Sequence, residues 1–122
     1  MDKAQRYVSS LRTPEMYRKY CEGMEKNNEG TKFFATAPAI KEFKYWKIIA
    51  NDYPYDKIAE VHHMLVPYRN FKHDSQMTSV ERNELQSVKS LLNQSYDCIV
   101  ENLIKNRSFP GHFHLHLIKY KV

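Results

Sequence analysis

Near the C-terminal end, the stretch Gly111-His112-Phe113-His114-Leu115-His116-Leu117-Ile118 alternates imidazole with apolar side chains. Strict alternation predicts a β-strand, because successive side chains of a strand point to opposite faces. The three histidines then share one face, while Phe113, Leu115 and Leu117 share the other face and can pack against a core. Near neutral pH an imidazole can act as nucleophile, proton donor or metal ligand, so the histidine face is the candidate functional site. The alternative is a strand that shows its histidines to solvent without a function.

The length and composition of the chain suit one globular domain. With 122 residues it can bury a core, and we expect a single domain over 1–122, with an N-terminal helical extension over 1–31 and a core over 32–122. Cys21 and Cys98 lie far apart without metal or redox spacing, which indicates two reduced thiols. The sequence shows no signal peptide and no run of roughly 20 apolar residues. We therefore expect a cytoplasmic protein without a membrane partner.

The formal net charge is +5, from 19 Lys and Arg residues against 14 Asp and Glu residues. These charges are interspersed along the chain, which is typical of a solvated surface. No aromatic RNA-binding motif organises the nine tyrosines and six phenylalanines. A nucleic-acid partner is therefore disfavoured, whereas a modest positive charge suits a small phosphorylated ligand.

The first helix is predicted to begin at Pro14, with Thr13 as its cap, because the missing N–H of proline costs nothing in the first helical turn. Apolar residues then recur at helical spacing: Met16, Tyr17, Tyr20, Cys21 and Met24. The turn-forming residues at 27–30 end the pattern.

Strands are predicted after this helix. A short one is possible over 32–35, and a better one over 43–50 is rich in aromatic and β-branched residues. The next strand, over 59–66, places His62 and His63 on opposite faces.

The stretch from Thr78 to Glu81 matches a capping box and predicts a second helix start. Apolar residues follow at i, i+3 and i+4 spacing: Leu85, Val88, Leu91, Leu92, Tyr96, Ile99, Val100, Leu103 and Ile104. We expect one amphipathic helix of about 25 residues, then a turn over 106–111 into the histidine strand. The order of elements predicts an α+β fold, an antiparallel sheet covered by helices on one face, with the histidines toward a cleft on the other.

At this point the sequence resembles the histidine triad (HIT) superfamily of nucleotide-binding hydrolases and transferases. The stretch from His112 to Ile118 matches the signature His-φ-His-φ-His-φ-φ, with φ apolar, at every position. The stretch from His62 to Arg69 is similar to the family strand His-x-Leu-Val-x-Pro-Lys-Arg. The family histidine stands five residues before the proline and faces the triad, which selects His62.

A third match is the segment from Ile49 to Pro54, similar to the family's Val-Asn-x-x-Pro, so that Asn51 or Asp52 would receive the ribose hydroxyls. The three matches follow the family order over 43–120. The resemblance implies a nucleotide ligand, a homodimer, and hydrolysis of a phosphoanhydride or phosphoramidate bond through a nucleotidyl-histidine intermediate, without a metal or cofactor.

The resemblance also implies a role for each histidine. His114 would be the nucleophile, and His116 would contact the phosphate and assist the leaving group. His112 would support the nucleophile through hydrogen bonding, and His62 would orient it from the neighbouring strand.

The sequence departs from the family just before the triad, where many members carry Gly-Gln-Ser or Gly-Gln-Thr as phosphate ligands. Here the counterpart is Arg107-Ser108-Phe109, and Asn106, Arg107 or Ser108 would take over that role. The third histidine, His116, is retained where the uridylyltransferase branch has Gln, which favours hydrolase chemistry.

Two other interpretations remain open. The departure before the triad makes a non-catalytic nucleotide sensor or adaptor plausible. A zinc site is the other, formed by the three histidines and His62. Alternate residues of a strand lie about 6.5–7 Å apart, which puts the outer two imidazoles too far apart to share one ion easily. The substrate and the base preference cannot be derived from these residues.

Overall fold

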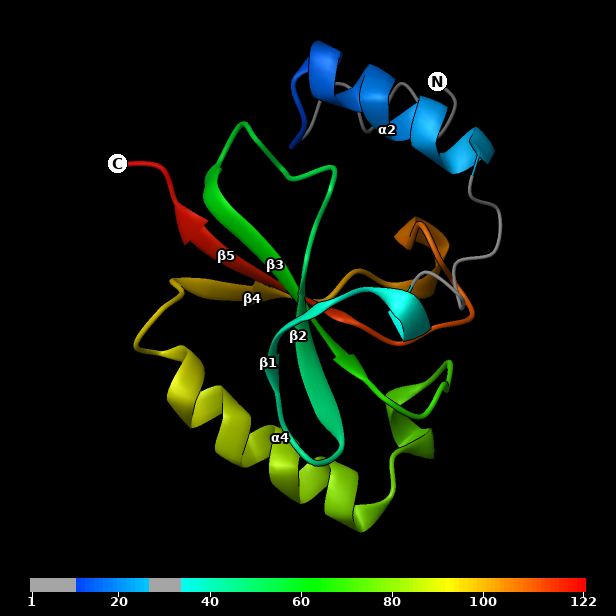
Figure 1. Cartoon of the computed structure of the whole chain (residues 1–122), viewed down its shortest axis with the longest axis vertical. Coiled ribbons are helices and arrows are strands. Elements are labelled where there is room, and N and C mark those ends of the chain that lie inside the picture. Colours follow the sequence, from blue (N-terminus) through cyan, green and yellow to red (C-terminus); the bar gives the residue numbers. More distant parts are fainter. Residues whose placement is uncertain (1–10, 27–33) are drawn as a thin grey trace.

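The computed structural model describes residues 11–26 and 34–122, which form an α+β fold (Figure 1). Its antiparallel sheet has the strand order β1-β2-β3-β5-β4. The strands are β1 (Ala39–Glu42), β2 (Trp46–Ala50), β3 (Ala59–Pro67), β4 (Cys98–Val100) and β5 (Leu115–Tyr120). The helices are α2 (Pro14–Lys26) and α4 (Ser79–Leu92), with short 3-10 turns η1 (Asp74–Gln76) and η2 (Ile104–Asn106). The predicted fold class is confirmed.

The helix α4 packs on one face of the sheet. It begins as predicted, because the Thr78 hydroxyl accepts from the Glu81 N–H and the Glu81 carboxylate accepts from the Thr78 N–H. The apolar face of α4 joins inward side chains of β2, β3, β5 and the segment before β5 in the main core: Trp46, Ile48, Leu65, Leu85, Val88, Leu92, Phe113, Leu115 and Leu117. The apolar half of the alternating stretch is thus buried against α4, as its pattern predicts.

The predicted 25-residue helix is wrong in its second half. The helix ends at Leu92, residues 93–95 form turns, and Cys98–Val100 pairs with β5 as the strand β4. The apolar residues of this stretch fit helical spacing and are also of types that are common in strands. Pairing with β5 satisfies the backbone hydrogen-bonding groups, and a local sequence pattern does not reveal this pairing.

Two further boundaries differ from the prediction. Residues 34–36 are helical, not part of a strand, and residues 32 and 33 lie outside the described chain. The predicted strand over 43–50 begins only at Trp46, because residues 43–45 form the connection from β1. The strand β1 itself was not predicted, and all four of its residues are exposed.

The opposite face of the sheet carries the histidines and is covered by a second set of elements. Phe34 packs there on Ile49, Met64 and Val66. The helix α2 lies beyond the far end of the sheet from α4 (Figure 1), and its residues help to line a pocket with His114 and His116. The long helix α4 thus covers one face of the sheet, while α2 contributes to the site from beyond the end of the sheet.

The start of α2 is confirmed. The Thr13 hydroxyl accepts from the Met16 N–H, and the Tyr17 N–H donates to the Thr13 carbonyl. The predicted stop over 27–30 lies outside the described residues. No helix in the described parts of the chain has the length and apolar content needed to cross a bilayer.

Candidate active site

The triad lies at the start of β5 and in the segment that leads into it. The strand begins at Leu115, so only His116 belongs to it, yet the alternation of faces extends back through His112. All three imidazoles are buried, each with 4% or less of its surface exposed. The triad and the equally buried His62 thus form a desolvated group, the histidine cluster, and two of its members, His114 and His116, line the pocket described below.

The backbone fixes the tautomer of His114. Its Nδ1 lies 2.9 Å from the carbonyl oxygen of His112, which can only accept a hydrogen bond. In the neutral ring the proton therefore sits on Nδ1, and Nε2 keeps a lone pair. His114 also lines the pocket described below, so it combines a fixed ring with an unprotonated nitrogen.

His62 and His116 form a hydrogen-bonded pair across β3 and β5. The Tyr55 backbone N–H donates to His62 Nδ1 at 2.9 Å, so neutral His62 carries its proton on Nε2. That nitrogen lies 2.8 Å from His116 Nδ1, which accepts, and the His116 proton is thereby placed on Nε2. His62 thus bonds His116, whereas the resemblance implied that it orients the nucleophile.

Tyr55 and Asn102 complete the surroundings of His116. The Tyr55 hydroxyl lies 3.5 Å from His116 Nε2 and accepts a hydrogen bond from Asn102 Nδ2 at 2.9 Å. Asn102 Nδ2 also lies 3.2 Å from His116 Nε2. The ring of Tyr55 packs against His62 and His116, with centroid distances of 4.5 and 5.1 Å.

His112 is held from the outside of the triad. Its Nδ1 bonds the Asn70 side-chain oxygen, and Phe34 packs on its ring with centroids 4.4 Å apart. Its buried Nε2 has no hydrogen-bond partner in the described chain. Phe34 also lies 5.2 Å from the His114 ring, so it excludes water from two members of the triad.

Burial lowers the pKa of every member of the histidine cluster, because the protonated form loses hydration. The pKa of His62 falls to about 3 and that of His112 to about 4, with nearby charges adding to the effect of burial. The pKa of His114 is also lowered, mainly by burial, and that of His116 is well below its usual value for the same reason. The four imidazoles are therefore neutral at pH 7.

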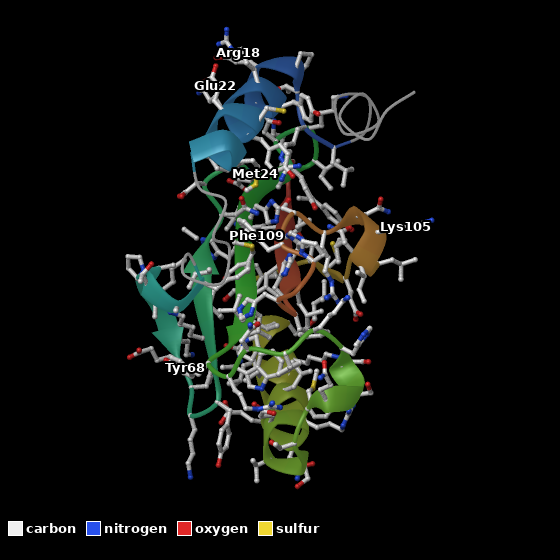
Figure 2. The ribbon with its side chains drawn as sticks, turned by 90° about the vertical axis from the view of Figure 1, so that its right-hand side faces the viewer. Arg18, Glu22, Met24, Tyr68, Lys105 and Phe109 are labelled. Carbon is white, nitrogen blue, oxygen red and sulfur yellow. The ribbon has the colours of Figure 1, made fainter. Side chains whose placement is uncertain are left out.

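A pocket opens next to His114 and His116, with an empty volume of about 570 Å³ that includes its mouth. The helix α2 and Arg12, two residues before it, form one wall. A hydrogen bond of 2.7 Å joins the Tyr20 hydroxyl to Ser108 Oγ across the pocket. Figure 2 shows Met24 on the side of α2 that faces the sheet. The lining comprises Arg12, Tyr20, Gly23, Met24, Asn51, Asp52, Tyr53, Met64, Ser108, Phe109, His114 and His116.

Three of the predicted nucleotide-binding residues lie on this pocket, namely Asn51, Asp52 and Ser108. The Asn51 side-chain oxygen accepts from the Tyr53 N–H at 2.8 Å, which fixes the loop after β2. Asn106 lies in η2 and is not part of the described lining.

Arg107 is placed differently from the expectation. Its guanidinium donates to the backbone carbonyls of Lys72, Pro110 and Asn102 at 2.8, 3.3 and 3.4 Å. It also lies 5.6 Å from the ring of Phe113, on the core side of the segment, and is 4% exposed. Arg107 thus ties three chain segments together and does not line the described pocket.

Several residues that the structure brings to the site could not be recognised from the sequence: Arg12, Tyr20, Asn70 and Asn102. They lie outside the alternating motif, and no local spacing connects them with it. Among the described residues, no group of three or more His, Cys, Asp and Glu side chains is arranged to hold a metal ion.

No protein-family model and no curated protein matches this sequence. Solved structures match its fold. A histidine triad protein from Clostridium difficile is 14% identical, with a TM-score of 0.55, over 79% of this chain and 92% of that chain. A HIT family hydrolase from Legionella pneumophila Philadelphia 1 is 17% identical, with a TM-score of 0.54, over 74% of this chain and 90% of that chain.

A Hit-like protein is also similar, at 17% identity and a TM-score of 0.56, over 74% of this chain and 96% of that chain. At such identities the likeness concerns the fold. The chain therefore has the fold of the histidine triad superfamily.

Proposed function

We propose that this protein is a nucleotide hydrolase that cleaves a phosphoanhydride or phosphoramidate bond of a nucleoside phosphate through a nucleotidyl-histidine intermediate. The observation that carries the proposal is His114, a neutral imidazole at a pocket, whose proton is held on Nδ1 by a backbone carbonyl. Such a ring offers Nε2 as a nucleophile without a preceding deprotonation. The names of the structural neighbours, two of them HIT family hydrolases, support the same class of reaction.

In the first step, His114 Nε2 attacks the phosphorus atom, and an N–P bond forms as the bond to the leaving group breaks. The leaving group departs with the electron pair of the broken bond and accepts a hydrogen bond from His116 Nε2–H, which lines the same pocket. A leaving nitrogen takes its proton from water. His62 supports His116 through their hydrogen bond.

In the second step, water attacks the phosphorus atom, the N–P bond breaks with its electron pair returning to His114 Nε2, and the water loses a proton to solvent. The product is a nucleoside monophosphate. Asn51 and Asp52 receive the ribose hydroxyls, and Ser108 contacts the phosphate, since all three lie on the pocket. Asn106 and Arg107 act from the loop behind it, by holding Ser108 in place.

A turnover assay with a dinucleoside polyphosphate and a nucleoside 5′-phosphoramidate tests the proposal. The kcat of the His114→Ala variant is expected to be at least about a thousandfold lower, because removal of a catalytic nucleophile costs that much or more. The His73→Gln variant, altered at an exposed histidine remote from the pocket lining, is the matched control and retains activity. Nucleotide binding without turnover in the unaltered protein would contradict the hydrolase and favour the sensor or adaptor.

A further inference from the structure

Arg12 is a buried cation at the wall of the pocket. It precedes α2, is 4% exposed, and lines the pocket together with His114 and His116. Among the residues that line the pocket in the described chain, it is the one that carries a permanent positive charge.

The backbone on both sides of Arg12 is tied to the loop after Tyr55. The Lys57 N–H donates to the Leu11 carbonyl at 3.0 Å. The Thr13 N–H and hydroxyl donate to the two Asp56 carboxylate oxygens at 2.8 and 2.7 Å. Arg12 therefore starts from a fixed backbone position.

The guanidinium itself is also oriented. Its Nε donates to the Tyr53 carbonyl at 2.9 Å. The guanidinium carbon lies 4.2 Å from the ring centroid of Tyr20 and 4.8 Å from that of Tyr55. Stacking on two rings fixes the plane of the group, which is the arrangement that directed recognition of a phosphate needs.

The histidines leave the charge of a phosphate unbalanced. They are neutral at pH 7, so they can offer N–H groups and a nucleophile but no net positive charge to an entering anion. Arg12 is close enough to oppose protonation of both His62 and His116, which places its charge in the same desolvated region. An anion that enters this region is stabilised by a cation far more than it would be in water.

We propose that Arg12 binds the phosphate of the ligand and makes the pocket selective for nucleotides over uncharged nucleosides. This inference rests on the proposed function and adds a residue from outside the alternating motif. Arg107 is bound to backbone carbonyls and brings no charge to the pocket, so Arg12 is the group that supplies that charge.

The test is calorimetric titration of the four nucleoside 5′-monophosphates and their parent nucleosides, at two salt concentrations. For the monophosphate that the unaltered protein binds most tightly, Arg12→Gln is expected to raise Kd about ten- to a hundredfold, the range for a charge-assisted hydrogen bond. The Kd of the parent nucleoside is expected to stay within about twofold, and the salt dependence of monophosphate binding is expected to decrease.

Two further variants separate charge from structure. Arg12→Lys keeps the charge but loses the planar group, so its monophosphate affinity is expected to lie between those of the unaltered protein and Arg12→Gln. Arg18→Gln is the matched control, because Arg18 is exposed on the outer side of α2 (Figure 2), and it is expected to bind normally.

The outcomes distinguish this inference from the proposed function. If the unaltered protein binds none of the monophosphates, the proposed function fails and this inference fails with it. If the unaltered protein binds one and Arg12→Gln binds it equally well, only the assignment of Arg12 is overturned. A parallel loss of nucleoside and monophosphate affinity with an unchanged salt dependence also overturns it, because that result shows that Arg12 only holds the wall in place.

Discussion

At the level of single residues, the protons of the site are positioned by backbone groups that do not titrate. The Tyr55 N–H sets the tautomer of His62, and through it that of His116. The His112 carbonyl sets the tautomer of His114. The chemical character of each imidazole therefore follows from the fold around it.

Arg107 gives a prediction about stability. Its guanidinium is nearly fully buried and donates to three backbone carbonyls. The Arg107→Gln substitution therefore leaves the Lys72 and Pro110 carbonyl oxygens without their charged donor. The free energy of unfolding is expected to fall by about 2–3 kcal/mol, within the range for hydrogen bonds to a charged group. Urea denaturation measures this loss as a lower midpoint.

The control for this variant is Lys105→Gln. Lys105 is exposed and extends from η2 into solvent (Figure 2), so its replacement is expected to change stability by less than about 0.5 kcal/mol. Equal stability of the Arg107→Gln variant and the unaltered protein would contradict the role of Arg107 in the fold.

The histidine triad of the candidate site could be predicted from the sequence, because His112, His114 and His116 lie within one strand-like pattern. The residues that surround them could not. Tyr55 and His116 are 61 positions apart, and Asn70 and His112 are 42 positions apart. Contacts over such separations arise from strand pairing and loop packing, which local periodicity does not encode.

At the level of elements, α2 closes the pocket through a tight approach to the loop after β2. Gly23 lies against the ring of Tyr53, and a Cβ at this position would collide with the Tyr53 hydroxyl. Tyr20 meets the same ring edge-on, with centroids 6.2 Å apart. The absence of a side chain at Gly23 is therefore what allows α2 to dock.

The Gly23→Ala variant tests this docking, because the change in stability has opposite signs for a docked and an undocked helix. In an undocked helix, alanine would stabilise by up to about 1 kcal/mol relative to glycine. In the docked helix the added methyl group displaces α2 or Tyr53, so we expect lower stability and faster hydrogen exchange of the α2 amides.

Two variants complete this experiment. Adding Tyr53→Phe removes the atom nearest to the new methyl group and is expected to restore part of the loss. Glu22→Ala, at an exposed neighbouring position, is expected to leave exchange in α2 unchanged. A stabilised Gly23→Ala variant would show that α2 is not docked as described.

The stretch after α4 shows where the prediction of secondary structure from the sequence fails. Apolar residues from Leu85 to Ile104 fit a helix, yet the chain leaves the helix after Leu92 and pairs Cys98–Val100 with β5. The Thr78 cap was predictable because it depends on residues three positions apart. The strand was not, because its partner lies beyond the loop that contains Arg107.

At the level of the whole molecule, the buried histidines make stability depend on pH. The pKa values of His62 and His112 in the folded chain, about 3 and about 4, lie below the ordinary value of 6.5. Between these values the unfolded chain binds protons that the folded chain does not, so stability falls as pH falls below 6.5. Each of these two histidines contributes a loss of about 1.4 kcal/mol per pH unit in that window.

Urea denaturation at pH 7, 6 and 5 measures the effect. The pKa values of Asp56 and Glu81 are lowered, the first by hydrogen bonds from Thr13 and the second by Arg69 and Thr78, although burial opposes both shifts. These carboxylates therefore stay ionised above pH 5 and do not account for the loss. The His62→Asn variant is expected to weaken the pH dependence of the free energy of unfolding. Equal stability of the unaltered protein at pH 7 and pH 5 would show that the histidine cluster is not desolvated.

The edge of the sheet gives a prediction about assembly. The strand β4 is an edge strand of the described sheet, and Leu91, Ile99 and Leu103 nearby are 47%, 38% and 68% exposed. An open edge with apolar neighbours is suited to pairing with a second copy of the chain. Light scattering is expected to give twice the 14.6 kDa mass of one chain.

The Ile99→Lys variant is expected to shift this mass to that of one chain, because a charge at the edge opposes strand pairing. Val80→Lys, at an exposed apolar position near the start of α4, is the control and is expected to remain dimeric. A single-chain mass for the unaltered protein at micromolar concentration would contradict the homodimer.

The central claim is that His114 Nε2 attacks the phosphorus atom, and the most direct measurement is a mass spectrum of the intact protein. The protein is mixed with a nucleoside 5′-phosphoramidate or a dinucleoside polyphosphate, quenched under alkaline denaturing conditions and digested. The account predicts a mass increase of one nucleoside monophosphoryl group, located on His114 and absent from His114→Ala. Hydrolysis that proceeds with no adduct on His114 and survives in the His114→Ala variant would contradict it.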